Sequence, residues 1–454
     1  MKMIFDVESK PRFGQLVVFA IQQMLAIMAA TIAVPMIIGN GLTPAAAMFG
    51  AGAGTIIYQL FTKFKSPVFL GSSFAFIGSM FAAFAGGVSM SLGYVGLILG
   101  AVFAGLVYVI IAAVIKAVGV NWINKLMPAV VIGPTVAIIG LSLAGNAIGD
   151  IMKGDVLNAE GVMAASPYAA LICGLITLAV TMLCSTYGKK MARLIPFILG
   201  ILAGYAAAAI LTFIGNTAGI DALKIIDFSV FAGYMLPEGV VGFETFLSLP
   251  KFTLVGAIDG LAELDWTYVI TILVAYVPVA FVVFAEHVAD HKNLSSIIER
   301  DLLSEPGLAN TLMGDGVGSM VGALFGGCPN TTYGESVGCV AITRNASVRT
   351  ITAAAIGSII VSFITPLVAF VDSIPACVMG GVCVALYGFI AVSGLKMLQQ
   401  VDLNKNRNLF TASVILIAGI GGLTLTFGAV TLTSIAAALI LGILTNTMLS
   451  KEKE

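Results

Sequence analysis

The sequence predicts an all-α membrane protein whose fourteen spanning segments form two inverted repeats of seven. Three observations lead to this fold class: the composition, the distribution of lysine and arginine, and short motifs that recur seven segments apart. Of the 454 residues, 59% are hydrophobic and 10% are charged, whereas about 25% of a soluble domain is charged. The mean hydropathy of +1.06 agrees with this composition, so we expect the chain to cross a membrane many times.

Fourteen apolar segments can cross the bilayer if spans that Gly or Pro interrupts are allowed to be shorter than about 20 residues. They lie near residues 14–38, 44–62, 68–86, 93–115, 128–148, 168–186, 194–214, 267–290, 308–326, 330–345, 350–371, 376–396, 409–426 and 430–448. The N-terminal stretch MKMIFDVESKPRF is polar, and the apolar run that follows it is too long for a signal peptide. We therefore expect no cleavable leader.

The lysines and arginines support both the even number of spans and their orientation. If both termini are cytoplasmic, every one of the 22 falls in an inward-facing segment except Lys153, Lys224 and Lys251. This is the bias of membrane proteins that keep positive charge inside, and one span more or fewer in the middle would scramble it. The longest loop, about 215–266, is acidic and is expected to form a partly ordered extracellular cap.

Two motifs recur seven spans apart. Met127-Pro-Ala-Val-Val-Ile-Gly133 starts the fifth span and Ile374-Pro-Ala-Cys-Val-Met-Gly380 starts the twelfth. In the same way, Leu70-Gly-Ser-Ser-Phe-Ala-Phe76 in the third span matches Asn330-Thr-Thr-Tyr-Gly-Glu335 in the tenth. An odd offset inverts the second copy, and inverted repeats with short broken segments point to a midplane substrate site in secondary transporters. The alternative is chance recurrence of the abundant Ala, Val and Gly.

The tenth predicted span carries a carboxylate. Residues 326–344 read GGCPNTTYGESVGCVAITR; the Gly and Pro at the start cannot continue a helix, and the residues Thr-Thr-Tyr favour an extended segment. Helix can resume afterwards, so Glu335 is expected in the first turn of a half-helix, whose free amides suit a carbonyl oxygen or an anion. The alternative is a re-entrant loop whose glutamate faces water.

The eighth predicted span ends in FVVFAEHVADHKN, residues 281–293. On a helix, Glu286 and Asp290 share one face, and His287 and His291, the only two histidines, share the neighbouring face. A buried carboxylate pair is costly unless one member is protonated or both face a cavity. Glu286 and Asp290 are therefore candidates for proton coupling. The alternative is that the helix has reached the cytoplasmic surface and the motif is a solvated end.

Other polar and aromatic residues lie inside predicted spans. Asp315, in a Gly-rich segment, is expected either to orient the site between helices or to lie near a loop. Gln22 and Gln23 are expected to hydrogen-bond across a helix interface. Phe74 and Tyr333 follow chain breaks and can stack on a planar ligand, although plain packing is the commoner role.

Several chemistries are not expected. The six cysteines lie in or beside apolar runs without a Cys-x-x-Cys pair, so we expect neither disulfides nor a zinc site. No histidine or carboxylate cluster has metal-ligand spacing, and no nucleophile lies in a recognisable pairing with a base. We therefore expect no cofactor, no enzyme activity and no nucleic-acid partner.

Taken together, the motifs resemble the nucleobase–ascorbate transporter family, in particular its uracil-transporting branch, over nearly the whole chain. The resemblance rests on SSFAF (72–76), AEHVAD (285–290), the run from Pro329 to Glu335, and the signature Glu335-Ser-x-Gly338-x-x-x-x-Thr343-Arg344. It implies short β-strands in spans three and ten with the substrate at their junction, and a homodimer. It also implies a core domain of residues 1–119 and 267–373 and a gate domain of residues 120–266 and 374–454.

The resemblance implies roles for individual residues. Those implied to bind the substrate are Phe74, Glu286, Tyr333, Gly334 and Glu335, and those implied to support the site are Gln23, Asp315 and Tyr387. The implied function is proton-coupled uracil uptake across the cytoplasmic membrane by movement of core against gate, with H⁺ as the coupling ion. Uracil has two N–H donors and two carbonyl acceptors, which match two carboxylates and a set of half-helix amides.

Three positions depart from the family pattern. Gln22-Gln23 stands where a glutamine–histidine pair is common, Asp290 where some uracil permeases have histidine, and Ser336 where asparagine often follows the signature acid. Two alternative functions stay open from the sequence. A xanthine or urate permease of the same family would typically have glutamine in place of Glu335. An anion exchanger of the same inverted-repeat design would need a cationic residue near Phe74 or Tyr333, and the sequence has none there.

Overall fold

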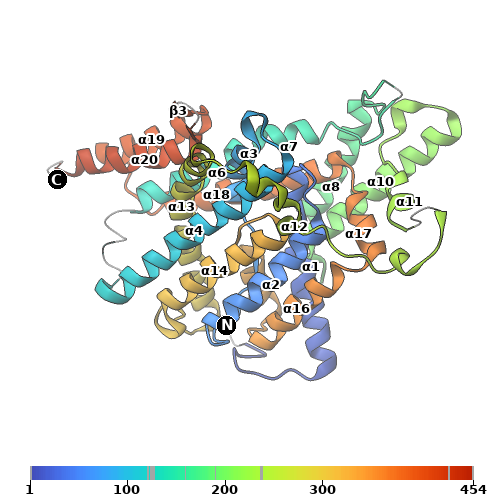
Figure 1. The fold of residues 1–454 in the computed structure, drawn as a ribbon. Helices are drawn as coiled ribbons and strands as arrows, with labels where there is room; N and C mark the ends of the chain where they lie inside the picture. Colours follow the sequence, from blue (N-terminus) through green and yellow to red (C-terminus); the bar gives the residue numbers. More distant parts are fainter. Residues whose placement is uncertain are drawn as a thin grey trace.

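The computed structural model describes residues 3–119, 122, 128–158, 160–189, 191–235, 239–427 and 430–451. Met127 of the fifth-span motif lies outside these residues. The chain forms a bundle of helices with two small sheets (Figure 1). Seven of the described helical segments are long and apolar enough to cross a membrane unaided, with α6 and α7 counted together as one.

The helices overlap the predicted spans. The first half contains α1 (Phe13–Ile38), α2 (Pro44–Phe61), α3 (Ile77–Ala83), α4 (Met90–Val118), α6 (Ala129–Ser142), α7 (Ala144–Asp150), α8 (Pro167–Tyr187), α9 (Met191–Leu194) and α10 (Pro196–Ala218). The second half contains α13 (Trp266–Ile298), α14 (Leu308–Gly326), α15 (Gly334–Thr343), α16 (Val348–Val361), α17 (Thr365–Asp372), α18 (Ala376–Leu398), α19 (Asn406–Ile420) and α20 (Ser434–Met448). Several starts are fixed by capping: the side chains of Thr43, Ser89 and Asp265 accept first-turn amides of α2, α4 and α13.

The helices pack in two groups. The α2–α14 group comprises α1, α2, α4, α13, α14 and α16, and the α6–α18 group comprises α6, α7, α8, α10, α18, α19 and α20 (Figure 1). Glycine permits close approach in both. A Cβ at Gly50 of α2 would collide with the carbonyl of Gly322 in α14, and one at Gly133 of α6 would lie 2.9 Å from the carbonyl of Gly394 in α18. Membrane helices commonly approach through such small residues.

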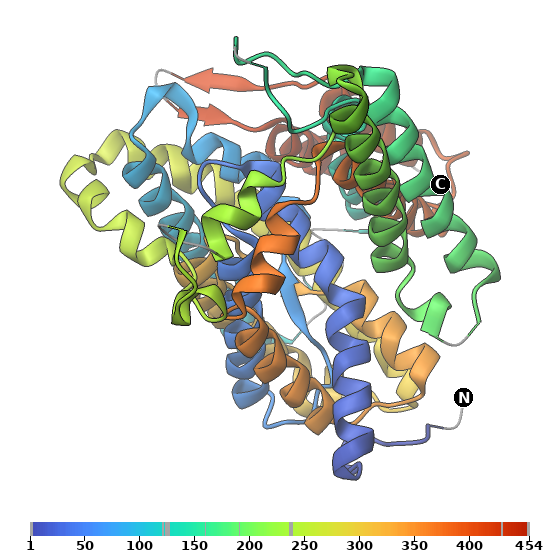
Figure 2. The same ribbon diagram turned by 90° about the vertical axis from the view of Figure 1, so that its right-hand side faces the viewer.

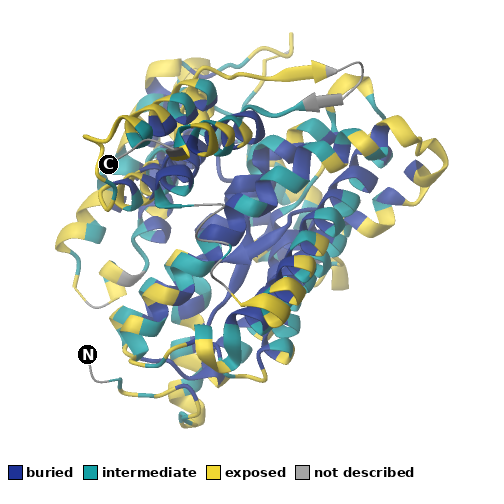
Figure 3. Cartoon of the chain, turned by 90° about the vertical axis from the view of Figure 1, so that its left-hand side faces the viewer, coloured by how far each residue is buried: buried dark blue, intermediate teal, exposed yellow. Residues whose placement is uncertain are grey.

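The described residues form two antiparallel sheets, of which the first joins distant parts of the chain. β1 (Leu70–Ser72) pairs with β2 (Asn330–Thr332), with Gly71 opposite Thr331. All six residues are buried inside the α2–α14 group, as Figure 3 shows for the centre of the molecule. β3 (Leu425–Phe427) and β4 (Val430–Leu432) form the second sheet, at the edge of the molecule (Figure 2). The strands expected in spans three and ten are therefore present and paired with each other.

The structure corrects several predicted spans. Predicted spans 409–426 and 430–448 are wrong at their facing ends, where alternating leucines and threonines form the β3–β4 hairpin instead of helix. Predicted span 350–371 divides into α16 and α17 because Pro366 has no amide to continue the helix. By contrast, predicted span 128–148 matches one apolar helical segment, Ala129–Asp150, in which α6 and α7 meet at Leu143.

The predicted acidic cap is partly helical. It contains α11 (Ser229–Met235), α12 (Thr253–Ala257) and short 3-10 turns. The amide of Ser248 donates to the carbonyl of Phe363, and the amide of Thr365 donates to the carbonyl of Phe246, each at 3.0 Å. These bonds tie the cap to the break between α16 and α17.

Candidate functional site

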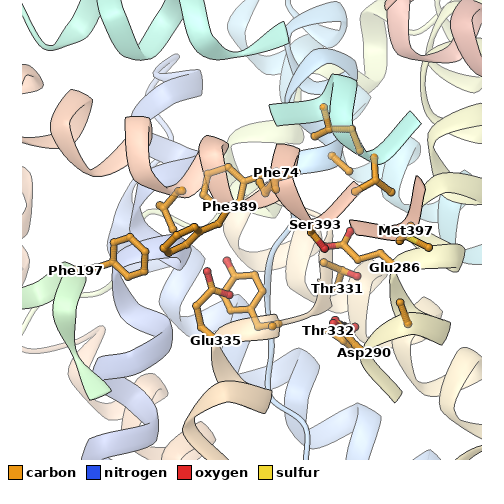
Figure 4. Close-up of a pocket in the computed structure, with 18 residues that line it drawn as sticks. Phe74, Phe197, Glu286, Asp290, Thr331, Thr332, Glu335, Phe389, Ser393 and Met397 are labelled. Atoms are coloured by element: carbon orange, nitrogen blue, oxygen red, sulfur yellow. Dashed lines mark hydrogen bonds between the residues drawn. The ribbon is translucent and has the colours of Figure 1, made fainter. Parts of the chain in front are cut away.

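A cavity of about 350 Å³ lies between the two helix groups, beside the β1–β2 sheet. Its lining consists of Phe74, Ala75, Val136, Ile139, Phe197, Glu286, Ala289, Asp290, Thr331, Thr332, Tyr333, Gly334, Glu335, Leu386, Phe389, Ile390, Ser393 and Met397. All five residues predicted to bind the substrate are in this lining, and so is the predicted proton-coupling candidate Asp290 (Figure 4). The structure thus brings together residues more than 250 positions apart in the sequence.

The β1–β2 sheet places two chain breaks side by side. Phe74 follows β1 and begins the short helix η1 (Phe74–Phe76), whereas Tyr333 follows β2 and caps α15. The Tyr333 hydroxyl donates to the carbonyl of Ser72 at 2.7 Å. Its ring covers Gly71 so closely that a Cβ there would collide with the ring. Both contacts fix the direction of the Tyr333 ring, and they require glycine at position 71.

The N-terminus of α15 points its first turn at the cavity. Glu335 lies in that turn, and no side chain caps the helix, so its first amides remain available to a ligand. The adjacent Ser336 anchors this end: its hydroxyl oxygen accepts from Gln23 Nε2 at 2.5 Å and from the amide of Phe69 at 3.1 Å. Gln23 therefore does not line the cavity but holds α15 against α1, across a helix interface as predicted.

The polar face of α13 supplies Glu286, Ala289 and Asp290 to the cavity. Thr332 of β2 donates a hydrogen bond to Asp290 Oδ2 at 2.8 Å, which joins α13 to the sheet. In Figure 4, Glu286 and Glu335 lie on opposite sides of the central space and Asp290 lies beside Thr332. The alternative of a solvated helix end is wrong, because α13 continues to Ile298 and both of its histidines are fully buried.

Asp315 lies behind α13 and not in the cavity. Its Oδ2 is 2.6 Å from Nδ1 of His287, and both side chains have no solvent exposure. The prediction offered a position between helices or one near a loop, and the structure places Asp315 between α13 and α14.

The α6–α18 group closes the cavity with apolar side chains that the sequence analysis did not identify. They are Val136 and Ile139 of α6, Phe197 of α10, and Leu386, Phe389, Ile390 and Met397 of α18, with Ser393 as the single polar member. The Pro-Ala-x-Val-x-Gly pattern shared by residues 127–133 and 374–380 indicated that α6 and α18 correspond to each other. It did not indicate which face of either helix would line a site. Tyr387 is outside the lining; its ring packs edge-on against Phe74 with centroids 5.9 Å apart.

The charged side chains among the described lining residues of the cavity are all acidic. Three carboxylates line it, and no lysine, arginine or histidine is among its described lining residues. Thr331, buried at the cavity wall, has a hydroxyl without a hydrogen-bond partner in the described structure. Nowhere in the described ranges do three or more His, Cys, Asp or Glu residues gather as a metal site would require. The cavity can therefore accept hydrogen bonds from a small planar donor and can hold protons on its carboxylates.

Comparison with known sequences gives full-length relatives. A family model described as "Permease family" matches residues 14–428. A uracil permease of Bacillus caldolyticus is 38% identical over 452 residues, which cover 99% of this chain and 95% of that protein. A uracil permease of Bacillus subtilis is 35% identical, with coverage of 100% of this chain and 97% of the relative.

Comparison with solved structures supports the fold of this chain but does not identify its ligand. The transmembrane domain of the cyanobacterial bicarbonate transporter BicA superposes with a TM-score of 0.62 at 16% identity, covering 96% of this chain and all of that domain. At this level of identity the arrangement of helices is shared, but the ligand is not implied.

Proposed function

The chain belongs to the nucleobase–ascorbate transporter family of permeases, and we propose that within this family it carries uracil into the cell together with protons. The proposal follows from the full-length uracil permease relatives and from one feature of the site. That feature is the meeting of Glu286 and Glu335, from two distant helices, across a small cavity.

The donors and acceptors of the cavity complement uracil. Carboxylates accept hydrogen bonds only, so Glu286 and Glu335 suit the two ring N–H groups of uracil. The uncapped first turns of η1 and α15 present amide donors, which suit its two carbonyl oxygens. Tyr333 and Phe74 supply flat faces against which a heterocycle can pack.

Proton coupling follows from the unbalanced charge. Because no cationic side chain lines the described cavity, closing it over ionised carboxylates would place negative charge in a poorly solvated site. A proton on Glu286, shared with Asp290, would lower this cost. Binding of a proton would thus favour the closed, loaded state, and its release would favour opening on the other side.

The two helix groups suit the division into core and gate. We infer that the α2–α14 group with its sheet is the core, that the α6–α18 group is the gate, and that transport moves one against the other. In this reading the chain makes fourteen crossings of the cytoplasmic membrane with both termini inside, and it works as a homodimer. Gln23, Asp315 and Tyr387 support the site from outside the cavity lining.

The shared fold with BicA raises anion transport as the second candidate. An anion would be repelled by three carboxylates with no cationic partner among the described lining residues, so the site favours a neutral donor such as uracil. Purine transport within the same family is not favoured, since the similar relatives are uracil permeases.

Uptake of labelled uracil into a bacterial host that lacks its own uracil transporter tests the proposal. We expect accumulation that a protonophore abolishes, that unlabelled uracil inhibits, and that bicarbonate and xanthine leave unchanged. Accumulation that persists after collapse of the proton gradient would refute the coupling. Inhibition by xanthine at concentrations equal to those of uracil would refute the substrate assignment.

A further inference from the structure

Five buried polar side chains form a cluster on the side of α13 that faces away from the cavity. This back cluster comprises Tyr58 of α2, His287 and His291 of α13, and Thr311 and Asp315 of α14, and none of the five is exposed to solvent. The two histidine rings stack with centroids 4.1 Å apart. Hydrogen-bond geometry decides where the protons of this cluster lie.

The tautomer of His291 follows from its partners. Its Nδ1 is 2.8 Å from the carbonyl oxygen of His287, and a carbonyl can only accept, so Nδ1 carries hydrogen. Its Nε2 is 2.7 Å from the Tyr58 hydroxyl. The Tyr58 hydroxyl donates its hydrogen to Ser66 Oγ at 2.7 Å, so Tyr58 links His291 to Ser66.

His287 carries hydrogen on Nε2. Its Nε2 is 3.0 Å from Thr311 Oγ1, and the threonine hydroxyl donates its own hydrogen to the carbonyl of Leu308 at 3.0 Å. Thr311 must therefore accept from His287, so Nε2 carries hydrogen. The remaining nitrogen, Nδ1, faces Asp315 Oδ2 at 2.6 Å.

The contact between His287 and Asp315 must contain a proton. A bare Nδ1 opposite an ionised carboxylate would set two lone pairs against each other at hydrogen-bond distance in a fully buried place. The proton lies either on the carboxyl group or on the imidazole. In both cases the pair has no net charge, which is the state that burial favours.

We propose that His287 and Asp315 jointly hold one proton inside the α2–α14 group, and that this neutral pair is a positioning device for α13. Residues on a helix are turned about 100° from their neighbours, so fixing His287 towards α14 turns Glu286 and Asp290 into the cavity. The pair is thus a proton-binding site separate from the carboxylates that face the substrate.

Other titratable groups surround the pair. Tyr58 approaches from α2 and Tyr108 from α4, and Glu286, Asp290 and His291 lie on α13 itself. Tyr108 Oη and Asp315 Oδ1 are both buried without a hydrogen-bond partner in the described structure. No lysine or arginine is in this group, so nothing in it would replace the proton as a source of positive charge beside Asp315.

Nitrogen NMR of the purified protein with labelled histidine tests the proton count directly. The chain has only two histidines, so only two rings contribute. We expect hydrogen on Nε2 of His287 and on Nδ1 of His291, with neither pattern changing between about pH 5.5 and 8.5, where an ordinary histidine titrates. Tyr58→Phe should alter the His291 signals while His287 keeps hydrogen on Nε2, which assigns them. A His287 ring that titrates in this range, or that lacks hydrogen on Nε2, would overturn the proposal.

Variants of Asp315 test the positioning role, and this arm rests on the proposed uracil binding. Asp315→Asn can still donate a hydrogen bond to Nδ1, whereas Asp315→Ala cannot. We expect Asp315→Ala to weaken labelled-uracil binding at least about tenfold and Asp315→Asn to restore affinity to within about threefold of the wild type. Ser319→Ala, one turn along α14 and also buried, is the control and should bind normally.

The NMR experiment and the binding experiment can each contradict the proposal without the other. If the wild type does not bind uracil, the substrate assignment fails while the histidine spectra still decide the proton count. If Asp315→Asn folds, as judged by size exclusion and melting temperature, but binds as poorly as Asp315→Ala, the neutral positioning pair is refuted.

Discussion

The two chain breaks at the centre of the molecule have similar backbones and different chemistry. At one, β1 leads through Phe74 into η1 and α3; at the other, β2 leads through Tyr333 into α15. Each has a three-residue strand, an aromatic residue at the break, and a helix without a side-chain cap. Only the second carries a charge, Glu335, in the first helical turn.

This difference separates what the two breaks share, which is the backbone, from what only the second break has, which is the charge. The backbone of the two breaks presents amide donors from two directions. The carboxylates come from one break and from α13, so hydrogen-bond acceptors for a ligand lie on one copy only. Substitutions that equalise the two breaks, or that disturb one and not the other, test this interpretation.

Removing the charge from the second break should have the largest effect. Glu335→Ala deletes an acceptor for a uracil N–H and leaves the donor unpaired, a loss of about 3 kcal/mol for a charged hydrogen bond, or more than hundredfold in Kd. Equilibrium binding of labelled uracil to purified protein measures this. Glu335→Gln keeps the shape and one acceptor oxygen, so it should bind more tightly than the alanine variant.

The control for Glu335 is Glu160→Ala, an exposed carboxylate in the linker before α8, which should bind uracil as the wild type does. If both Glu335 variants also keep wild-type affinity, the second break contributes backbone only and the two breaks are equivalent.

Variants of the two α13 carboxylates test whether uracil binding and proton coupling depend on different groups. Glu286→Gln keeps one acceptor oxygen but cannot bind or release a proton. It should weaken uracil binding about tenfold, and it removes the group that we propose to carry the proton. Accumulation of labelled uracil in whole cells should then no longer exceed the level reached with a protonophore. Asp290→Asn can still accept from Thr332, so we expect normal affinity and reduced accumulation.

The outcome that contradicts this reading is protonophore-sensitive accumulation in both variants. Proton coupling would then depend on groups other than Glu286 and Asp290, and these two carboxylates would serve only to bind uracil.

A methyl group at the first break should disturb the second. In Gly71→Ala the new Cβ would collide with the Tyr333 ring, and overpacking of this kind destabilises the fold by about 1 kcal/mol or more. Because the ring must shift, we also expect uracil Kd to rise about fivefold. Gly78→Ala, later in the same broken span, meets nothing within 4 Å and is the matched control. Equal affinities for the two variants would mean that the position of the Tyr333 ring does not matter for binding.

The sequence predicted the elements of the site better than its walls. Glu286, Asp290 and Glu335 stood out because charges inside apolar spans are rare, and the break before Glu335 was marked by glycine and proline. Phe197, Phe389 and Met397 could not be singled out, because an apolar residue in an apolar helix carries no signal of whether it faces lipid, a neighbouring helix or a cavity.

The sequence also predicted spans more reliably than their interruptions. Pro366 marks the division between α16 and α17, and alternation of leucine and threonine from Leu423 to Thr426 could have indicated the β3–β4 hairpin. The partner of Asp315 could not be predicted in this way: His287 lies 28 positions away, and only the packing of α13 on α14 joins them.

The same asymmetry extends to the helices α6 and α18, and it gives the smallest predicted effect. Both begin after a proline, Pro128 and Pro375, but the amide of Ala376 in α18 donates to Asp155 Oδ1 at 3.1 Å. Asp155 lies in the linker between α7 and α8. Burial raises the pKa of Asp155 to about 6, and the hydrogen bond from Ala376 only partly opposes this.

The sign of the pH dependence follows from that pKa. Between the unfolded pKa of about 3.9 and about 6, the folded state binds more protons than the unfolded state, so stability falls as pH rises through this window and stays low above it. Asp155→Asn removes the buried charge and keeps an acceptor for Ala376. It should therefore stabilise the protein by about 1 to 3 kcal/mol at pH 7.5 and have no effect near pH 4. Melting temperatures of the wild type and the variant at the two pH values measure this. A variant that is destabilised at pH 7.5 would show instead that the ionised carboxylate of Asp155 is what holds the start of α18.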